Sequence, residues 1–207
     1  MKLHHHPLSA NARRAVMTAA ALGADVDLVF VDLAKTEQKR PGFLRMNPNG
    51  RVPVLEDGDF VLWESHAIML YLAEKTPGQT LLPVEPRGRA DVTRWMFWTS
   101  HHFAPAVGGL NFEHLIKRFR GLGDADPREV ERGERLVLDC ARVLDHHLEG
   151  REWLAQDRLT LADISVATPL MALESARLPI MGGSDHRHLR AWFSRVQDLP
   201  AWKATST

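Results

Sequence analysis

The chain has 207 residues, of which 44% are hydrophobic and 25% charged, as in soluble globular proteins with one large domain or two small ones. Lysine plus arginine and aspartate plus glutamate balance at 26 each. This balance excludes a strong field for nucleic acid or anionic membrane, and we expect the dispersed arginines to be solvated. One cysteine excludes an intrachain disulfide. Because membrane-span and signal-peptide patterns are absent, we expect a cytoplasmic protein.

Residues 1–33 predict a strand, a helix and a second strand. The opening MKLHHH is short and strand-like. Residues 9–23 are rich in alanine, with Ser9 suited to the N-cap and Gly23 to the stop. Residues 25–33 alternate acidic and apolar side chains, which indicates a half-buried strand.

A hairpin and a helix follow. RVPVLE and DFVLW are joined through Asp57-Gly58, a strong hairpin signal. ESHAIMLYLAEK then places Ile68, Tyr71 and Leu72 on one helical face. Together these elements predict a small α/β domain with a mixed four-stranded sheet and flanking helices.

The rest of the chain predicts a linker and an all-helical domain. TPGQTLLPVEPRG has three prolines and no helical period, as an interdomain linker would. Four helices are then expected, with Pro105 bending or ending the first. The second has a capping box from Asp126 to Glu129, and the third has one from Thr160 to Asp163. The expected domain bounds are 1–77, 78–87 for the linker, and 88–207.

Pro53 is unusual because it stands between two valines in an apolar strand. Proline cannot donate to a strand ladder. A cis Val52–Pro53 bond would turn the chain and leave the N–H and C=O of Val52 available to an extended peptide. Shortly afterwards, Glu64 and Ser65 open a helix, where free N–H groups favour a carboxylate and Glu64 can receive an ammonium. These groups suit a ligand with an amino-acid head and a peptide-like body.

On these residues the chain resembles the cytosolic glutathione transferase family. The resemblance is carried by NPNGRVPVLEDGD, ESHAIMLYL and LTLADISVA, which stand in the family's order along the whole chain. It implies a thioredoxin-like N-terminal domain, an all-α C-terminal domain, a homodimer, and a detoxifying enzyme that joins glutathione to small hydrophobic electrophiles. No metal and no nucleic acid are implied.

The resemblance also implies a glutathione site. Val52 would pair with the cysteinyl backbone of glutathione, and Pro53 matches the family's cis-proline. Glu64 and Ser65 would hold the γ-glutamyl group, and Arg51 could reach the ligand's backbone or carboxylate. In the loop KTEQKRPGF, the candidates for the glycyl carboxylate are Gln38 and Arg40, with Lys35 and Lys39 behind them.

HPLSANARR resembles the serine-type branch of the family, in bacterial theta-, phi- or beta-like form, with Ser9 as the activating residue. A thiol with a pKa near ~8.5 is mostly protonated at neutral pH, and lowering it by one unit needs about 1.4 kcal/mol. A hydroxyl at a helix N-terminus supplies part of this stabilisation. Asn11 could support Ser9 or the ligand. The alternative, less favoured, is that Ser9 is only a helix cap.

Residues that could line the electrophile pocket are weaker candidates. By resemblance they are His5, His6, Trp98, His102 and Phe103. The adjacent histidine pairs do not have metal-ligand spacing. Cys140 lies among apolar residues of a helix, where packing is the simpler role.

Two other functions stay open from the sequence. The protein could bind glutathione as a carrier or interaction partner with little catalysis. It could also be another glutathione enzyme, such as a dehalogenase, isomerase or peroxidase. A cysteine-type disulfide reductase is disfavoured because HPLSANARR contains no cysteine.

Overall fold

The computed structural model describes residues 1–175 and 185–205. By contacts the chain divides into two compact units, Met1–Pro83 with Asp198–Thr207, and Val84–Gln197. The C-terminal segment therefore belongs with the first unit by its contacts, whereas the sequence reading grouped it with the helical domain. The reason is that helix α10 contacts α1, a long-range pairing that no local pattern encodes.

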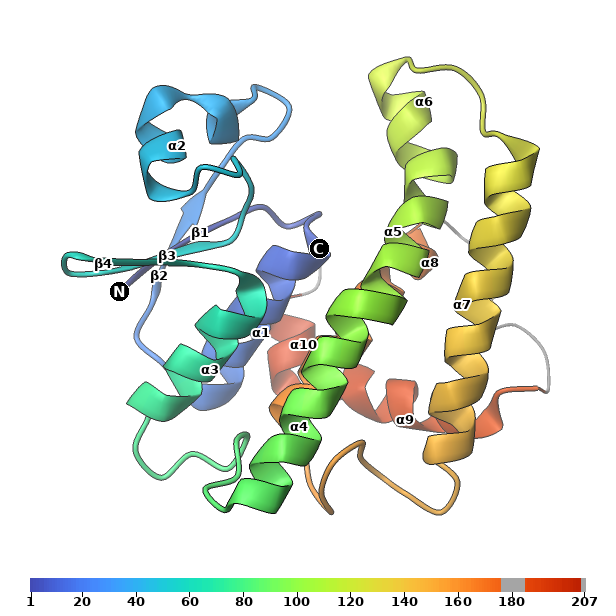
Figure 1. The fold of residues 1–207 in the computed structure, drawn as a ribbon. Helices are drawn as coiled ribbons and strands as arrows, with labels where there is room; N and C mark the ends of the chain where they lie inside the picture. The colour runs from blue at the N-terminus through green and yellow to red at the C-terminus, as the bar shows by residue number, and fades with distance from the viewer. Residues whose placement is uncertain (176–184, 206–207) are drawn as a thin grey trace. The chain divides into compact units, whose positions relative to one another are not determined.

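The first unit contains a mixed four-stranded sheet, which confirms the predicted fold class. The strand order is β2-β1-β3-β4, with β1 parallel to β2 and the other pairs antiparallel. Figure 1 shows α1 and α3 on one face of this sheet and α2 on the other. The elements are β1 (Lys2–His5), α1 (Ala10–Leu22), β2 (Asp27–Phe30), η1 (Glu37–Lys39), α2 (Pro41–Met46), β3 (Val54–Asp57), β4 (Phe60–Trp63), α3 (Ser65–Lys75) and α10 (Pro200–Ala204).

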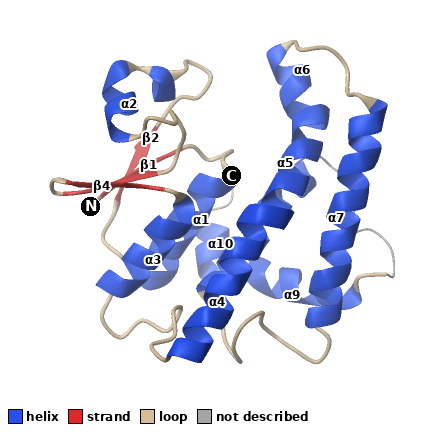
Figure 2. Ribbon diagram, viewed as in Figure 1, coloured by secondary structure: helices blue, strands red, loops and turns tan. Residues whose placement is uncertain are grey.

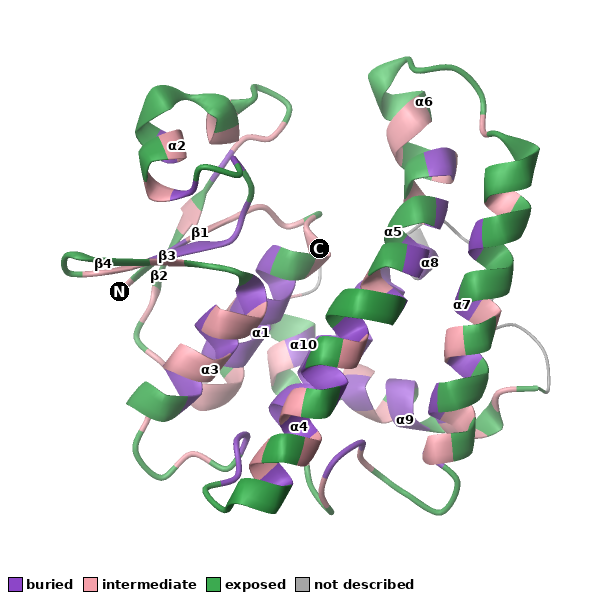
Figure 3. Ribbon diagram, in the orientation of Figure 1, coloured by how far each residue is buried: buried purple, intermediate pink, exposed green. Residues whose placement is uncertain are grey.

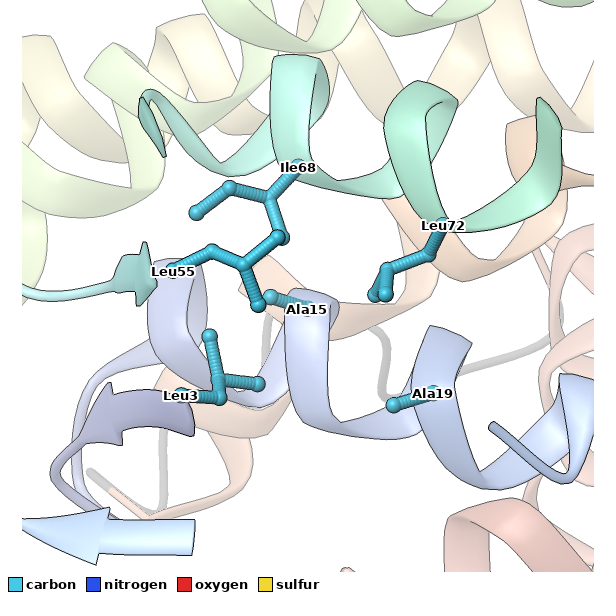
Figure 4. Close-up of a cluster of buried hydrophobic side chains, with 6 residues drawn as sticks. All are labelled: Leu3, Ala15, Ala19, Leu55, Ile68 and Leu72. Atoms are coloured by element: carbon cyan, nitrogen blue, oxygen red, sulfur yellow. The ribbon is translucent and has the colours of Figure 1, made fainter. Parts of the chain in front are cut away.

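The main core of this unit lies between the sheet and helices α1 and α3. Leu3 of β1 stands opposite Leu55 of β3 in the sheet register. Both leucines are fully buried beneath the two helices, because residues directly opposite each other on neighbouring strands face the same side of the sheet. Figure 4 shows the six buried side chains of this cluster, Leu3, Ala15, Ala19, Leu55, Ile68 and Leu72.

A second, smaller core contains Val52 and anchors the Pro53 segment. It consists of Ala12, Val31, Phe43, Val52 and Val54. The side chain of Val52 is 7% exposed. Because this side chain is buried, the main chain at Val52–Pro53 is held in one place.

Several predicted elements differ from the structure in extent. The stretch expected to be a loop forms η1 and the short helix α2. A tertiary anchor explains α2, since buried Phe43 holds it to the second core. Strand β2 is largely exposed rather than half-buried, because it is an edge strand. The last helix is interrupted before Pro200, which begins α10.

Every described secondary-structure element of the second unit is helical, as predicted (Figure 2). These elements are α4 (Pro86–Trp98), η2 (Thr99–Phe103), α5 (Ala104–Asn111), η3 (Phe112–Ile116), α6 (Lys117–Arg120), α7 (Pro127–His147), α8 (Leu161–Ser175) and α9 (Arg187–Gln197). Of the two outcomes predicted for Pro105, bending or ending the helix, the second does not occur. The chain passes from α4 through the short π-helix η2 into α5, and Pro105 is the second residue of α5.

The cap of α7 also differs from its prediction. Asp126 caps the helix, accepting from the N–H of Arg128 at 2.9 Å. The reciprocal partner is not Glu129, which pairs with Arg132. Instead, the N–H of Asp126 donates to the carboxylate of buried Glu113 at 2.7 Å, a long-range bond that a local capping rule cannot anticipate.

The predicted box at Thr160 and Asp163 is confirmed and lies in the core. The Asp163 carboxylate accepts from the N–H and the hydroxyl of Thr160 and from the N–H of Leu154. It also accepts from the indole N–H of Trp192 at 2.9 Å. Helix α8 is buried along most of its described length (Figure 3). Within residues 1–175 and 185–205, no helix is long and apolar enough to cross a membrane.

We expect Asp163→Ala to lower the free energy of unfolding by about 3 kcal/mol or more, because it leaves several buried donors without an acceptor. Urea unfolding followed by circular dichroism measures the change. The matched control is Asp157→Ala, an exposed aspartate six positions earlier. Equal stability of the two variants would contradict the role assigned to this carboxylate.

Candidate active site

A small recess in the first unit gathers residues from three parts of its chain. Its volume is about 130 Å³. Six of the lining residues were predicted from sequence, and Asn47 and Asn49 were not. The lining residues are Asn11, Asn47, Asn49, Arg51, Val52, Pro53, Glu64 and Ser65. Typical small-molecule pockets hold about 300–1,000 Å³, so this recess fits one end of a peptide-sized ligand.

The Val52–Pro53 bond is cis, as the sequence predicted. Buried Asn47 fixes the preceding loop: its amide donates to the C=O of Arg51 at 2.7 Å, and its oxygen accepts from the N–H of Asn49 at 3.0 Å. Among the described residues, no backbone hydrogen bond outside the helices and strands uses the N–H or C=O of Val52. These two groups suit the addition of an extended peptide.

Glu64 adopts a rare backbone conformation at the start of α3. Its φ is 75° and its ψ is 111°. A residue with a side chain costs about 1–3 kcal/mol in such a region, and such residues concentrate at functional sites. The Glu64 side chain is exposed and accepts no capping hydrogen bond from α3. Glu64 therefore lines the recess without capping its own helix.

Arg14 lies behind the recess and was not predicted as part of the site. It is 2% exposed. Its Nη1 donates to the hydroxyl of Ser65 at 2.9 Å and to the amide oxygen of Asn11 at 3.1 Å. Burial lowers the pKa of Arg14 to about 9, and the charge of Glu64 acts in the opposite direction. The guanidinium thus stays positive at neutral pH.

His66 is a neutral neighbour of this guanidinium. Burial, and next the charge of Arg14, lower the pKa of His66 to about 2. The first turn of α3 therefore carries no histidine charge near the recess at neutral pH.

Ser9 is the N-cap of α1. Its hydroxyl oxygen accepts from the N–H of Ala12 at 3.2 Å, which leaves the hydroxyl hydrogen available to a ligand. Ser9 does not line the recess, although Asn11 of the same helical turn does. Capping and ligand contact are compatible roles for this hydroxyl.

The basic loop before α2 lies next to the recess without lining it. Lys39 Nζ donates to the C=O of Asn49 at 3.2 Å. Gly50 has a φ of 58°, and a Cβ there would come within 2.9 Å of the Gln38 carbonyl oxygen. Arg40 is exposed and pairs with Glu37 at 3.2 Å. Lys35 pairs with Asp32 at 3.1 Å.

His5 and His6 lie at a separate pocket of the first unit. This pocket has a volume of about 160 Å³, and α10 contributes to its wall. The His6 ring lies 5.3 Å from that of Phe30. Burial, and next the charge of His6, lower the pKa of His5.

The helical unit has its own cavity of about 460 Å³, which Trp98, His102 and Cys140 help to line. Phe103 does not line it, since this side chain is 1% exposed and stacks on Trp98 in the core. Burial raises the pKa of Cys140 to about 11, so its thiol is protonated at neutral pH. Among the described residues, no group of three or more His, Cys, Asp or Glu side chains could hold a metal ion.

Sequence reasoning missed Arg14, Asn47 and Asn49. It treated arginines on helices as solvated, but both Arg13 and Arg14 are buried. One signal was present: two adjacent arginines interrupt a helix that is otherwise rich in alanine. The asparagines belong to the NPNGR loop and could have been weighed as loop-forming residues.

A thioredoxin-like domain followed by an all-helical domain is the architecture of the class of glutathione-dependent transferases. Residues 1–74 match the family model for the glutathione S-transferase N-terminal domain. Residues 102–200 match that for the C-terminal domain. The chain therefore belongs to the glutathione S-transferase family, and it is a glutathione-dependent transferase.

Similar proteins agree with this assignment. Glutathione S-transferase 3 of Zea mays is 38% identical, over 99% of this chain and 92% of its own. Glutathione transferase F7 of Populus trichocarpa has a TM-score of 0.90 and 29% identity, covering 99% and 96% of the two chains. Maize glutathione S-transferase I, solved with an atrazine glutathione conjugate, has a TM-score of 0.88 and 29% identity, covering 99% and 95% of the two chains. All three are plant proteins, so they do not support the bacterial branch of the family that was expected from the sequence.

We expect Glu64→Gly to have a free energy of unfolding about 1 kcal/mol higher than Glu64→Ala, because only glycine relieves the positive φ. Urea unfolding of the two variants measures this difference. For comparison, the same pair of substitutions at Glu74, inside α3, is expected to favour alanine. If alanine is also favoured at position 64, the backbone strain assigned to Glu64 is wrong.

Proposed function

We propose that this protein is a serine-type glutathione transferase that joins the thiolate of glutathione to small hydrophobic electrophiles. The observation that carries the proposal is the recess in the first unit, where Val52, Glu64 and Ser65 meet. Family membership supports the same activity.

The recess offers complementary groups to the γ-glutamyl end of glutathione. Glu64 would receive the ammonium, while the Ser65 hydroxyl and the N–H groups of the first turn of α3 would hold the carboxylate. The N–H and C=O of Val52 would pair with the cysteinyl main chain. Arg51 would reach the ligand's backbone or carboxylate with its positive charge, and Gln38 or Arg40 would meet the glycyl carboxylate.

Ser9 would activate the thiol. Paired as described, the ligand's cysteine would extend from Val52 toward the start of α1, where the Ser9 hydroxyl and the free N–H groups of the helix favour a thiolate. The thiolate attacks the electrophile, and the protein contributes by holding the two together. Because the nucleophile belongs to glutathione, Cys140 is not needed.

We also propose that the protein is a cytoplasmic homodimer. Family resemblance supports the dimer. Large apolar side chains exposed on the helical unit, such as Phe97, Leu136 and Val143, are compatible with subunit contact. Sedimentation equilibrium measures the dimer, and a monomer at micromolar concentration would contradict it.

Steady-state assays with a general aromatic electrophile separate a transferase from a carrier. A transferase forms conjugate well above the spontaneous rate, with saturation in both substrates. Saturable glutathione binding without that rate would favour the carrier. Parallel assays with hydroperoxides test the peroxidase alternative.

We expect Ser9→Ala to raise the pKa of bound glutathione by about 1–2 units, because one hydrogen bond to a charged group is lost. Turnover at neutral pH should fall about tenfold or more, with little change in glutathione affinity. Thiolate absorbance as a function of pH measures the pKa. Ser9→Thr, which keeps the hydroxyl, is the control, and an unchanged pKa in Ser9→Ala would move the activating role to Asn11 or a backbone amide.

We expect Ser65→Ala to weaken glutathione binding about tenfold, which corresponds to about 1.4 kcal/mol for one hydrogen bond. The thiol pKa of bound glutathione should not change. Isothermal titration calorimetry measures the affinity. Wild-type affinity in this variant would reject the assigned contact.

A further inference from the structure

We propose that Arg14 is a positioning residue of the glutathione site, which orients the Ser65 hydroxyl and the Asn11 amide so that both donate hydrogen bonds to the ligand's γ-glutamyl carboxylate. The inference rests on the proposed function. It assigns a role to a residue that lies behind the site.

The contacts of Arg14 connect the two helices that border the recess. One guanidinium nitrogen, Nη1, donates both to Ser65 of α3 and to Asn11 of α1. Ser65 and Asn11 also line the recess, whereas Arg14 does not. Arg14 therefore acts on the ligand through these two side chains.

The hydrogen bonds from Arg14 determine which hydrogen-bonding groups Ser65 and Asn11 present to the recess. An arginine only donates, so the Ser65 oxygen and the Asn11 amide oxygen are both acceptors in these bonds. The hydroxyl hydrogen of Ser65 and the amide hydrogens of Asn11 then point elsewhere. Because both residues line the recess, these hydrogens are available to a ligand there. A carboxylate, which accepts only, is the group that matches two converging donors.

Charge favours the same ligand group. Arg14 is a buried cation, and a buried charge is costly unless other charges or hydrogen bonds compensate it. Glu64 supplies part of this compensation, and the neighbouring His66 is neutral. A ligand carboxylate in the recess adds a second negative charge close to Arg14 and at the N-terminus of α3.

Arg13 provides an internal comparison. It is 5% exposed, nearly as buried as Arg14. Its guanidinium lies 3.8 Å from the ring centroid of Trp202, and its Nη2 donates to the Trp202 carbonyl at 3.2 Å. These contacts fasten α10 to α1 and involve no residue of the recess. The two adjacent buried arginines of α1 thus have different partners: Arg13 contacts α10, and Arg14 contacts residues of the recess.

The test compares glutathione with γ-aminobutyryl-cysteinyl-glycine, which lacks the carboxylate of the γ-glutamyl group. Calorimetry gives the affinity of both ligands for wild type, Arg14→Met and Arg14→Lys. We expect wild type to prefer glutathione by roughly 10–100-fold, the range for hydrogen bonds to a charged group. In Arg14→Met the preference should fall to about threefold or less, and Arg14→Lys should restore part of it because the charge is kept.

The control is Arg13→Met, which should retain the wild-type preference even if it is less stable. If Arg14→Met weakens both ligands by the same factor, Arg14 has only a structural role and the proposal is overturned. If wild type binds neither ligand, the proposed function itself fails, and the two failures are therefore distinguishable.

Two further variants test the proposal if Arg14→Met does not fold. Asn11→Ala and Ser65→Ala each remove one of the two groups that Arg14 orients. Both should fold, since Asn11 is exposed and the Ser65 side chain is small. Each is expected to lower the preference for glutathione over its analogue, and a wild-type preference in both would overturn the proposal.

Discussion

The packing of α1 beside α3 on one face of the sheet is the constraint on which the site depends. Small residues, Ala15 and Ala19, belong to the buried cluster between these elements and allow a close approach. This approach brings Arg14 of α1 to within 2.9 Å of Ser65 in α3. The first turns of the two helices, each with its free N–H groups, thereby border one recess.

The site concentrates features that would be unfavourable elsewhere. Glu64 has a positive φ, Arg14 is a charge removed from water, and Val52 presents main-chain groups suited to a peptide partner. Proteins accept such exceptions where the surrounding structure holds them and a ligand gains from them. Here the Val52–Pro53 segment is held in place, because the side chain of Val52 is buried in the core and Asn47 hydrogen-bonds to the C=O of Arg51.

Elements with strong local signals were predicted well. The hairpin, the Ser9 cap and the Thr160–Asp163 box all depend on residues a few positions apart. Elements stabilised by distant partners were missed or misjudged. Helix α2 depends on Phe43 in the second core, and the cap of α7 uses Glu113 from another helix.

The sequence by itself determined the order of elements, the turn at Pro53 and the candidacy of Val52, Glu64 and Ser65, because capping, turn and periodicity rules act over short distances. The resemblance to the glutathione transferase family added Asn11 and Arg51. Only the tertiary structure decided that Arg14 is buried behind Ser65 while neighbouring Arg13 holds α10. Both arginines look alike in the sequence. Their difference comes from residues about 50 and 190 positions away along the chain, which only folding brings near.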